Sequence, residues 1–378
     1  MLFSKMRHLG KTKFPWLVSI LCLLLFLITA CQSTRVPGEN TVHELESLEL
    51  ESNELNIVLI QHDSCPWSYF WCAVRQGVSD AARDFNVNVT IERPDRGLYL
   101  PEDDAHTQKT LFEEALEKNP CPDAIGVTLV DRQELKESLN KAFCKSEQRG
   151  ESPKPIPVVI YNSNSGTRKN SINYDNIYIG QDDQQAGYEA GLRLAQKAKE
   201  LSIDGTIRGV CIKQSATAEN LQDRCIGFEQ AMNENGIIPK TLSTSSKTID
   251  PVTIKEDIEI YYNNNPDTKI FLSLGPIGAI PFYEFKREKD LQPGTFVHGT
   301  FDLSQKIIEE IDDRTTEFAV DQQPYLQGYL VVQWLTWIKR HDFEPYFEQR
   351  KNRIIPTGPF FVDKNNLEKV ETQVGQYR

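Results

Sequence analysis

The folded part of the chain begins with the stretch LNIVLIQHDSCPWSYFWCAVRQGVSDAARDFNVNVTI, residues 55–91. An apolar run at 56–60 is followed by apolar side chains at helical spacing, from Trp71 to Phe85, and then by a second β-type run at 87–91. Short apolar runs that alternate with amphipathic helices are typical of a parallel sheet covered by helices. The stretch therefore predicts an α/β fold.

The same alternation continues to the end of the chain. Further strands are expected at 124–130, 157–161, 207–212, 269–274, 295–300 and 318–320, and helices at 111–116, 132–144, 183–201, 220–235, 254–264 and 324–338. A polar stretch divides the series into two similar sets, and roughly 320 residues exceed what one core usually serves. We expect two doubly wound parallel-sheet lobes joined by a multi-strand hinge. The expected bounds are 55–163 plus about 323–353 for the first lobe, and 164–322 plus about 354–378 for the second.

Residues 1–30 have the pattern of a signal peptide. A basic start precedes an apolar run from Trp16 to Ala30, which is shorter than the ~20 residues that span a bilayer. The junction LITAC, residues 27–31, resembles a bacterial lipobox and predicts an acylated Cys31; the alternative is an ordinary signal peptide that leaves Cys31 free. The polar, acidic residues 31–54 are expected to form a disordered tether. We therefore expect an exported, membrane-anchored lipoprotein.

The charge and the cysteines narrow the possibilities further. A net charge of -12 makes nucleic acid an improbable partner, because phosphate binding needs a basic stripe. Six cysteines remain after Cys22 and Cys31, and an even count in an exported protein suggests disulfides. Fifteen pairings are possible. Close spacing favours Cys65 with Cys72, Cys121 with Cys144, and Cys211 with Cys225. A metal site is the weaker alternative, because no CxxC pair or His cluster is present.

The sequence contains none of the common catalytic motifs. There is no HExxH, P-loop, GxGxxG or GxSxG, and we expect neither enzyme activity nor a cofactor. A hydrolase that uses Asp302 with a second carboxylate stays open, since such pairs are set by tertiary geometry.

Aromatic and neutral polar residues follow the expected strands, where open α/β sheets bind their ligands. Ring stacking combined with Asp, Asn and Gln groups suits the apolar face and hydroxyl rim of a sugar. The candidates are Ser68, Phe70, Trp71, Asn162, Asp302 and Gln322. Four of these residues also have a structural alternative. Trp71 could belong to the core, and Asp302 could cap a helix that begins near Ser304. Asn162 and Gln322 could instead satisfy backbone groups in the hinge.

Several segments resemble the type I periplasmic sugar-binding proteins of ABC transporters, the ribose and simple-sugar group. They are SYFW (68–71), QGVSDAA (76–82), IPVV (156–159), IGQD (179–182), DRCIGF (223–228), GTFD (299–302) and DQQPYLQG (321–328). The resemblance spans about residues 55–365, and the final motif is the most specific.

The resemblance implies a periplasmic-binding-protein-like fold of type I and a role for each matching residue. Phe70 and Trp71 match the two rings that stack on the sugar, and Ser68 matches a polar contact. Asn162, Asp302 and Gln322 match the amide or acidic residues at two strand ends and in the hinge. Gln222 matches a further contact position and is the seventh candidate. Ribose receptors carry a basic residue there and an arginine where this chain has Ser163, so the resemblance implies a ligand other than ribose.

The implied function is the capture of a small sugar or polyol and its delivery to an ABC permease. The related LacI-type repressors begin with a helix-turn-helix, whereas this chain begins with a signal peptide. The alternative function is a ligand-sensing subunit that docks on a membrane histidine kinase or chemoreceptor.

Overall fold

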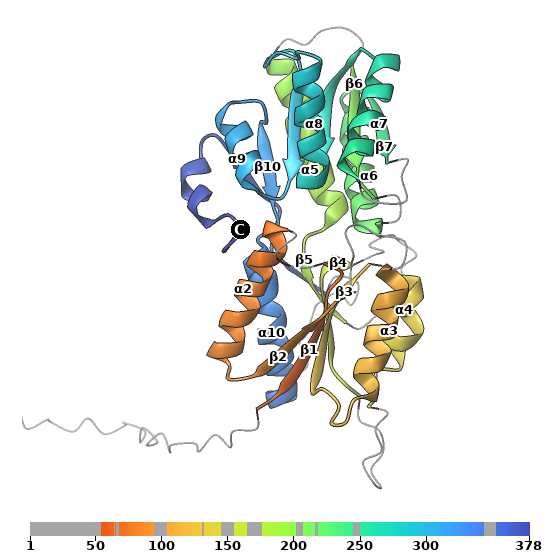
Figure 1. Cartoon of the computed structure of the whole chain (residues 1–378), viewed down its shortest axis with the longest axis vertical. Helices are drawn as coiled ribbons and strands as arrows, with labels where there is room; N and C mark the ends of the chain where they lie inside the picture. The colour runs from red at the N-terminus through yellow and green to blue at the C-terminus, as the bar shows by residue number, and fades with distance from the viewer. Residues whose placement is uncertain are drawn as a thin grey trace, which may run out of the picture. The chain divides into compact units, whose positions relative to one another are not determined.

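A computed structural model of the chain describes residues 54–63, 65, 68–93, 104–130, 132–144, 155–164, 176–201, 207–215, 218–244, 250–343 and 353–378. The expected signal peptide, the lipidation candidate Cys31 and the tether as far as residue 53 lie outside the described residues. The described chain forms two six-stranded sheets with helices on their faces, which confirms the predicted fold class (Figure 1).

The first sheet has the order β11-β5-β4-β3-β1-β2, and every neighbouring pair is parallel. Its strands are β1 (Asn56–Ile60), β2 (Asn88–Glu92), β3 (Ala124–Leu129), β4 (Val158–Asn164), β5 (Ile177–Gly180) and β11 (Ile354–Pro356). Helices α2 and α10 pack together against its core, and α3 and α4 pair separately. These helices are α2 (Tyr69–Asp84), α3 (Asp104–Glu117), α4 (Arg132–Asn140) and α10 (Pro324–His341). We call this unit the first lobe.

The second sheet repeats the plan in the order β12-β10-β9-β8-β6-β7, and only the β10–β12 pair is antiparallel. Its strands are β6 (Arg208–Lys213), β7 (Ile238–Ser243), β8 (Thr268–Ser273), β9 (Val297–Phe301), β10 (Phe318–Asp321) and β12 (Phe360–Asp363). Its helices are α5 (Asp183–Glu200), α6 (Glu219–Glu234), α7 (Pro251–Asn264), α8 (Pro276–Glu288) and α9 (Gln305–Asp312), with short turns η1 (Leu367–Lys369) and η2 (Glu371–Gln373). We call this unit the second lobe.

Strand pairing places two segments differently from the expected lobe boundaries. β5 lies after residue 163 but pairs with β4, and β11 lies after 353 but pairs with β5, so both belong to the first sheet. The first and third crossings between the lobes therefore come later than expected, at residues 181–182 and 357–359, whereas the second lies at the expected place, residues 322–323. The polar stretch at 162–173 suggested an earlier crossing. The composition of a segment does not show with which strand the next strand of the chain pairs.

Among the elements of the second lobe that the sequence did not predict are strand β7 and helix α8. β7 is a half-exposed edge strand, so its apolar alternation is weak. Helix α8 contains Pro281, and an internal proline usually indicates the end of a helix. Proline at the first position of α8 is compatible with a helix start.

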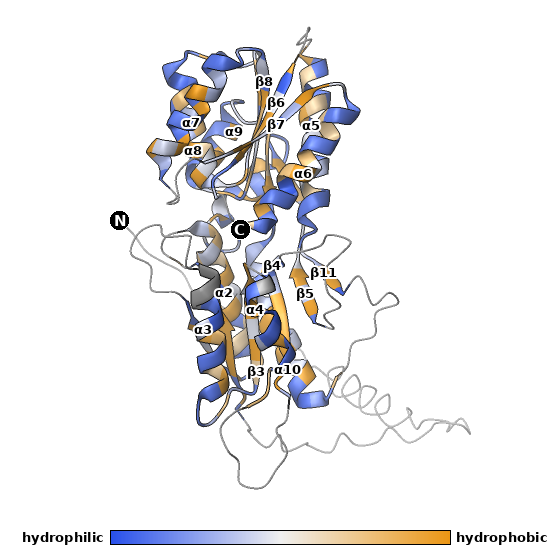
Figure 2. Cartoon of the chain, turned by 90° about the vertical axis from the view of Figure 1, so that its right-hand side faces the viewer, coloured by the Kyte–Doolittle hydropathy of each residue, from blue (hydrophilic) through white to orange (hydrophobic). Residues whose placement is uncertain are grey.

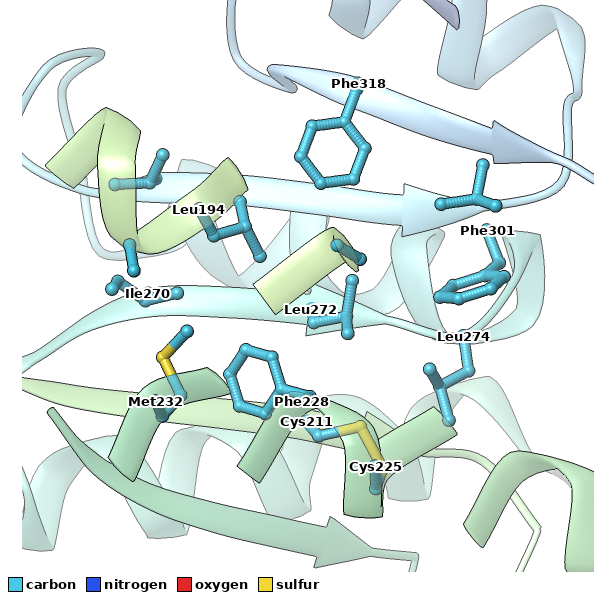
Figure 3. Close-up of a cluster of buried hydrophobic side chains, with 14 of the residues drawn as sticks. Leu194, Cys211, Cys225, Phe228, Met232, Ile270, Leu272, Leu274, Phe301 and Phe318 are labelled. Carbon is cyan, nitrogen blue, oxygen red and sulfur yellow. A yellow bond between two sulfur atoms is a disulfide. The ribbon is translucent and has the colours of Figure 1, made fainter. Parts of the chain in front are cut away.

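Each lobe has its own hydrophobic core between sheet and helices. Strands such as β6 and β8 are largely apolar, whereas the helices alternate between apolar and polar residues, as amphipathic helices on a sheet do (Figure 2). In the second lobe, Phe228 and Met232 of α6 lie against Ile270 and Leu272 of β8, beside the disulfide formed by Cys211 and Cys225 (Figure 3). The disulfides Cys65–Cys72 and Cys121–Cys144 are also present, so all three predicted pairings are confirmed.

Glycines allow the helices of each lobe to approach closely. A Cβ atom on Gly77 of α2 would lie 2.1 Å from the backbone oxygen of Tyr325, and one on Gly328 of α10 would lie 2.1 Å from that of Val74. The second lobe repeats this reciprocal contact between α5 and α6 through Gly187 and Gly227. Both helix pairs would have to separate to admit a side chain.

Candidate functional site

A cavity of about 420 Å³ is lined by residues that follow the strands of both lobes. From the first lobe it receives residues after β1 and in the first turn of α2, together with Val130, Asn162 and Ser163. The second lobe supplies residues after β6, β8, β9 and β10 and at the starts of α6, α7 and α8. This is the position expected for the ligand of a doubly wound sheet, outside the carboxyl ends of its strands.

The rings that line the cavity all come from the first lobe. Trp71 makes edge contacts with Phe70 at 5.3 Å and with His62 at 5.0 Å between ring centroids. Phe70 and Trp71 are 8% and 4% exposed and also belong to the hydrophobic core. The core alternative for Trp71 and its place in the cavity are therefore both correct.

Ser68 lies at the start of α2 beside these rings. It occupies the N-cap position, yet its side chain makes no capping hydrogen bond and lines the cavity. Cys72, in the first turn of the same helix, forms a disulfide with Cys65. This bond ties the loop after β1 to the helix that carries the rings.

Asp302 follows β9 and is held by Gln322 from the hinge. The Gln322 Nε2 donates to Asp302 Oδ1 at 2.5 Å. Helix α9 is capped instead by Ser304, whose side chain accepts from the Ile307 backbone N–H at 3.2 Å. The helix-cap alternative for Asp302 is thus wrong.

Arg224 of α6 connects this pair to a second carboxylate. It donates from Nη2 to Gln322 Oε1 at 2.9 Å and from Nε to Asp183 Oδ1 at 2.8 Å. Its guanidinium also lies 4.4 Å above the centre of the Phe301 ring, and the residue is 2% exposed. A chain of hydrogen bonds therefore runs from the partly buried Asp302, which lines the cavity, through Gln322 and Arg224 to the buried Asp183 behind it.

Asn162 lies beside this chain, in the first lobe. Its Nδ2 donates to Gln327 Oε1 at 3.1 Å, while its backbone oxygen accepts from the Tyr178 hydroxyl at 2.8 Å. Gln327 Nε2 in turn donates to the backbone oxygen of Gln322 at 3.0 Å. The side chains of Asn162 and Gln322 thus bond to other side chains rather than to hinge backbone groups, so these contacts do not bear out their structural alternative, and both residues line the cavity.

Burial changes the ionisation of the acidic groups. Loss of solvation raises the pKa of Asp302 to about 6, against the opposing effects of Arg224 and the Gln322 hydrogen bond. Burial likewise raises the pKa of Asp183, although the nearby Arg224 charge acts in the opposite direction. Asp302 is thus the carboxyl at this site whose charge changes near neutral pH.

The structure brings together six of the seven sequence candidates: Ser68, Phe70, Trp71, Asn162, Asp302 and Gln322. The seventh, Gln222, is not among the lining residues, and its Oε1 accepts from Lys213 Nζ at 2.9 Å. Sequence reasoning missed Arg224 and Gln214. Arg224 stands inside the DRCIGF motif, and Gln214 would have been found by applying the strand-end rule to β6.

Among the described residues, no group of three or more His, Cys, Asp or Glu side chains could hold a metal ion. Within the same residues, no helix is both long and apolar enough to cross a membrane.

Comparison with known proteins gives consistent matches. A family model described as a periplasmic binding protein domain matches residues 67–338. A carbohydrate transporter protein from Acidothermus cellulolyticus, solved with myo-inositol, is 25% identical with a TM-score of 0.67, and the match covers 85% of this chain and 98% of that one. GanP, a glucose-galactose binding protein from Geobacillus stearothermophilus, is 22% identical with a TM-score of 0.66 over 83% and 99% of the two chains; at this identity it supports the fold alone.

A curated relative extends the match at the level of sequence. The xylose/arabinose-binding protein XylF of Sulfolobus acidocaldarius is 30% identical over 184 residues. The match covers 46% of this chain and spans 44% of that protein, less than half its length.

Proposed function

Because the chain belongs to the periplasmic binding protein domain family, we propose that it captures a neutral sugar or polyol outside the cytoplasm and delivers it to an ABC permease. The observation that carries the proposal is the composition of the cavity, in which Phe70 and Trp71 of one lobe join Asp302 and Gln322 of the other. Rings bind the apolar face of a sugar, and a carboxylate accepts from its hydroxyls.

The charges at the site favour a ligand without a net negative charge. Arg224 pairs with Asp183, and both side chains are nearly inaccessible, at 2% and 6% exposure. The carboxylates that line the cavity are Asp63 and Asp302, and Asp302 is stabilised by an amide rather than by a second cation. An anionic sugar would therefore meet a carboxylate and an arginine that is already neutralised.

The names of the relatives agree with this ligand class. The Acidothermus protein was solved with myo-inositol, and the archaeal relative is named for xylose and arabinose. The proposed contacts are Ser68, Phe70, Trp71, Asn162, Asp302 and Gln322. Contacts from both lobes to one ligand would favour closure of the lobes around it. The proposal assigns no chemical step to these residues.

Calorimetric titration with pentoses, hexoses and inositols tests the proposal. We expect at least one neutral sugar or polyol to bind with a Kd of about 1 μM, or ~8 kcal/mol. Sugar phosphates and uronic acids serve as charged controls and are expected to bind more weakly than their neutral counterparts. If an amino acid or peptide raises the melting temperature while no sugar or polyol does, the sugar assignment is wrong.

We also propose that Cys31 carries the lipid that anchors the protein. The support is the lipobox-like junction at residues 27–31, which follows an apolar run too short for a typical membrane span.

A further inference from the structure

Gln214 lines the cavity just after β6, and its side-chain oxygen has no hydrogen-bond partner among the described residues. The residue is 8% exposed, and its Oε1 is a buried acceptor that no donor among the described residues reaches. Buried side-chain amides are normally satisfied, and an exception in a native protein calls for an explanation such as a ligand. Within the described residues the Gln214 side chain thus makes no hydrogen bond: Oε1 is its buried, unpaired atom, and Nε2 is the atom that borders Gly275.

Gly275 leaves the space in front of this amide open. A Cβ atom on Gly275 would lie 3.5 Å from Gln214 Nε2 and 3.4 Å from Asp302 Oδ2. On the other side of the amide, Oε1 lies 3.6 Å from the equivalent position on Gly278, in the first turn of α8. The amide nitrogen of Gln214 and one carboxylate oxygen of Asp302 thus border the same side-chain-free space.

The two groups are complementary in hydrogen bonding. Asp302 Oδ1 already accepts from Gln322, whereas Oδ2 takes part in no hydrogen bond within the described residues. Gln214 Nε2 is a donor and Asp302 Oδ2 an acceptor. A hydroxyl can accept from the first, and a neighbouring hydroxyl can donate to the second.

We propose that Gln214 and Asp302 form a clamp for two adjacent hydroxyls, seated over Gly275. This inference rests on the proposed function and specifies it further. The ligand class becomes sugars and cyclic polyols that carry a vicinal diol on the side that faces the second lobe. The clamp also makes Gln214, rather than Gln222, the glutamine that determines specificity in this lobe.

Gln214→Met tests the clamp, because methionine keeps the approximate length of the side chain and removes both polar atoms. Gln222→Met is the matched control, since Gln222 bonds to Lys213 and does not line the cavity. The probes are myo-inositol, D-xylose, D-arabinose and the monodeoxy derivatives of whichever of these binds most tightly. We expect Gln214→Met to weaken that tightest probe at least tenfold and Gln222→Met to change it less than twofold.

A deoxy probe distinguishes a direct contact from a structural effect. For one monodeoxy derivative, wild type and Gln214→Met should bind equally, because the hydroxyl that meets Gln214 is absent. Gly275→Ala should weaken the parent probe as well, since its methyl group would enter the space between the two polar groups. Because a side chain at φ 156° is also strained, the melting temperature of this variant is measured beside its affinity, and only a loss of affinity without a comparable loss of stability supports the clamp.

The outcomes separate the inference from the proposed function. If the parent probe binds wild type and Gln214→Met equally, the clamp is wrong and sugar binding stands. A loss of affinity that is the same for every deoxy derivative also overturns the clamp, because it assigns Gln214 a structural role. If wild type binds no sugar or polyol, both proposals fail.

Discussion

Asn162 and Asp302 hold the same left-handed backbone conformation at the ends of equivalent strands, with φ of 60° and 59°. β4 and β9 occupy the same place in the strand order of their sheets. A positive φ is uncommon outside glycine, although Asn and Asp adopt it more readily than other residues. Residues in this region cluster at functional sites, and here both side chains belong to the cavity lining.

Replacement of Asp302 by alanine should weaken sugar binding at least tenfold. Hydrogen bonds to a charged group contribute about 1.5–3 kcal/mol each, and ~1.4 kcal/mol corresponds to a factor of ten in Kd. Calorimetry with the tightest panel sugar measures the effect. Asp313→Ala is the control, since Asp313 is exposed and does not line the cavity. Equal losses in the two variants would remove Asp302 from the binding site.

Asp302 should contribute a loss of stability to the ligand-free protein as the pH rises from about 4 to about 6. Burial raises the folded pKa of Asp302 from 3.8 to about 6, so in this range the folded state binds more protons than the unfolded state. Stability gained from the protonated carboxyl is therefore lost as pH rises through the folded pKa. Chemical denaturation at several pH values measures the slope, and Asp302→Asn should flatten it. If the slope is unchanged in Asp302→Asn, the pH dependence of stability arises from the neighbouring Asp183 or Asp321 instead.

Sugar affinity should depend on pH in the opposite sense. The ionised Asp302 accepts from hydroxyls, and the ionised fraction falls below a pKa of about 6. If only this form binds, affinity at pH 5 should be about tenfold lower than at pH 7, since apparent affinity scales with the competent fraction. Calorimetry across pH 5–8 measures this, with Asp302→Asn as the control. A flat profile for wild type would show that the charge of Asp302 does not contribute to binding.

Arg224→Met should destabilise the fold by about 3–5 kcal/mol, because it leaves the buried carboxylate of Asp183 without its cation. The control is Arg208→Met. Arg208 pairs with Asp267, but these side chains are 33% and 35% exposed, and such pairs contribute only ~0–1 kcal/mol. Adding Asp183→Asn to Arg224→Met should restore part of the loss. Denaturant titration measures all four proteins, and equal effects of the two arginine substitutions would contradict the buried-pair explanation.

Cys31→Ser should release the protein from the membrane fraction if Cys31 is the lipid attachment site. Fractionation and intact-mass measurement of the mature protein test this together. The matched control is Cys22→Ser, which removes a cysteine from the expected signal peptide and leaves the junction intact. Unchanged processing and membrane association in Cys31→Ser would make the lipid anchor wrong.

The sequence by itself determined the features that depend on local pattern. Period-two and helical spacing predicted most strands and helices of both lobes, and cysteine spacing predicted all three disulfides. Phe70, Trp71, Asn162 and Asp302 were found because parallel strands bring their carboxyl ends to one edge of the sheet. That rule needs the order of elements in the chain and no side-chain geometry.

Only the tertiary structure decided the pairing of distant strands and the direction of individual side chains. β5 and β11 join the first sheet through hydrogen bonds to partners that local composition does not identify. Gln222 and Arg224 are two residues apart in α6, and at 3.6 residues per turn their side chains point about 200° apart around the helix axis. The resemblance therefore pointed to Gln222 as a contact, whereas the docking of α6 on its sheet turns Arg224 toward Gln322 at the cavity and Gln222 toward Lys213.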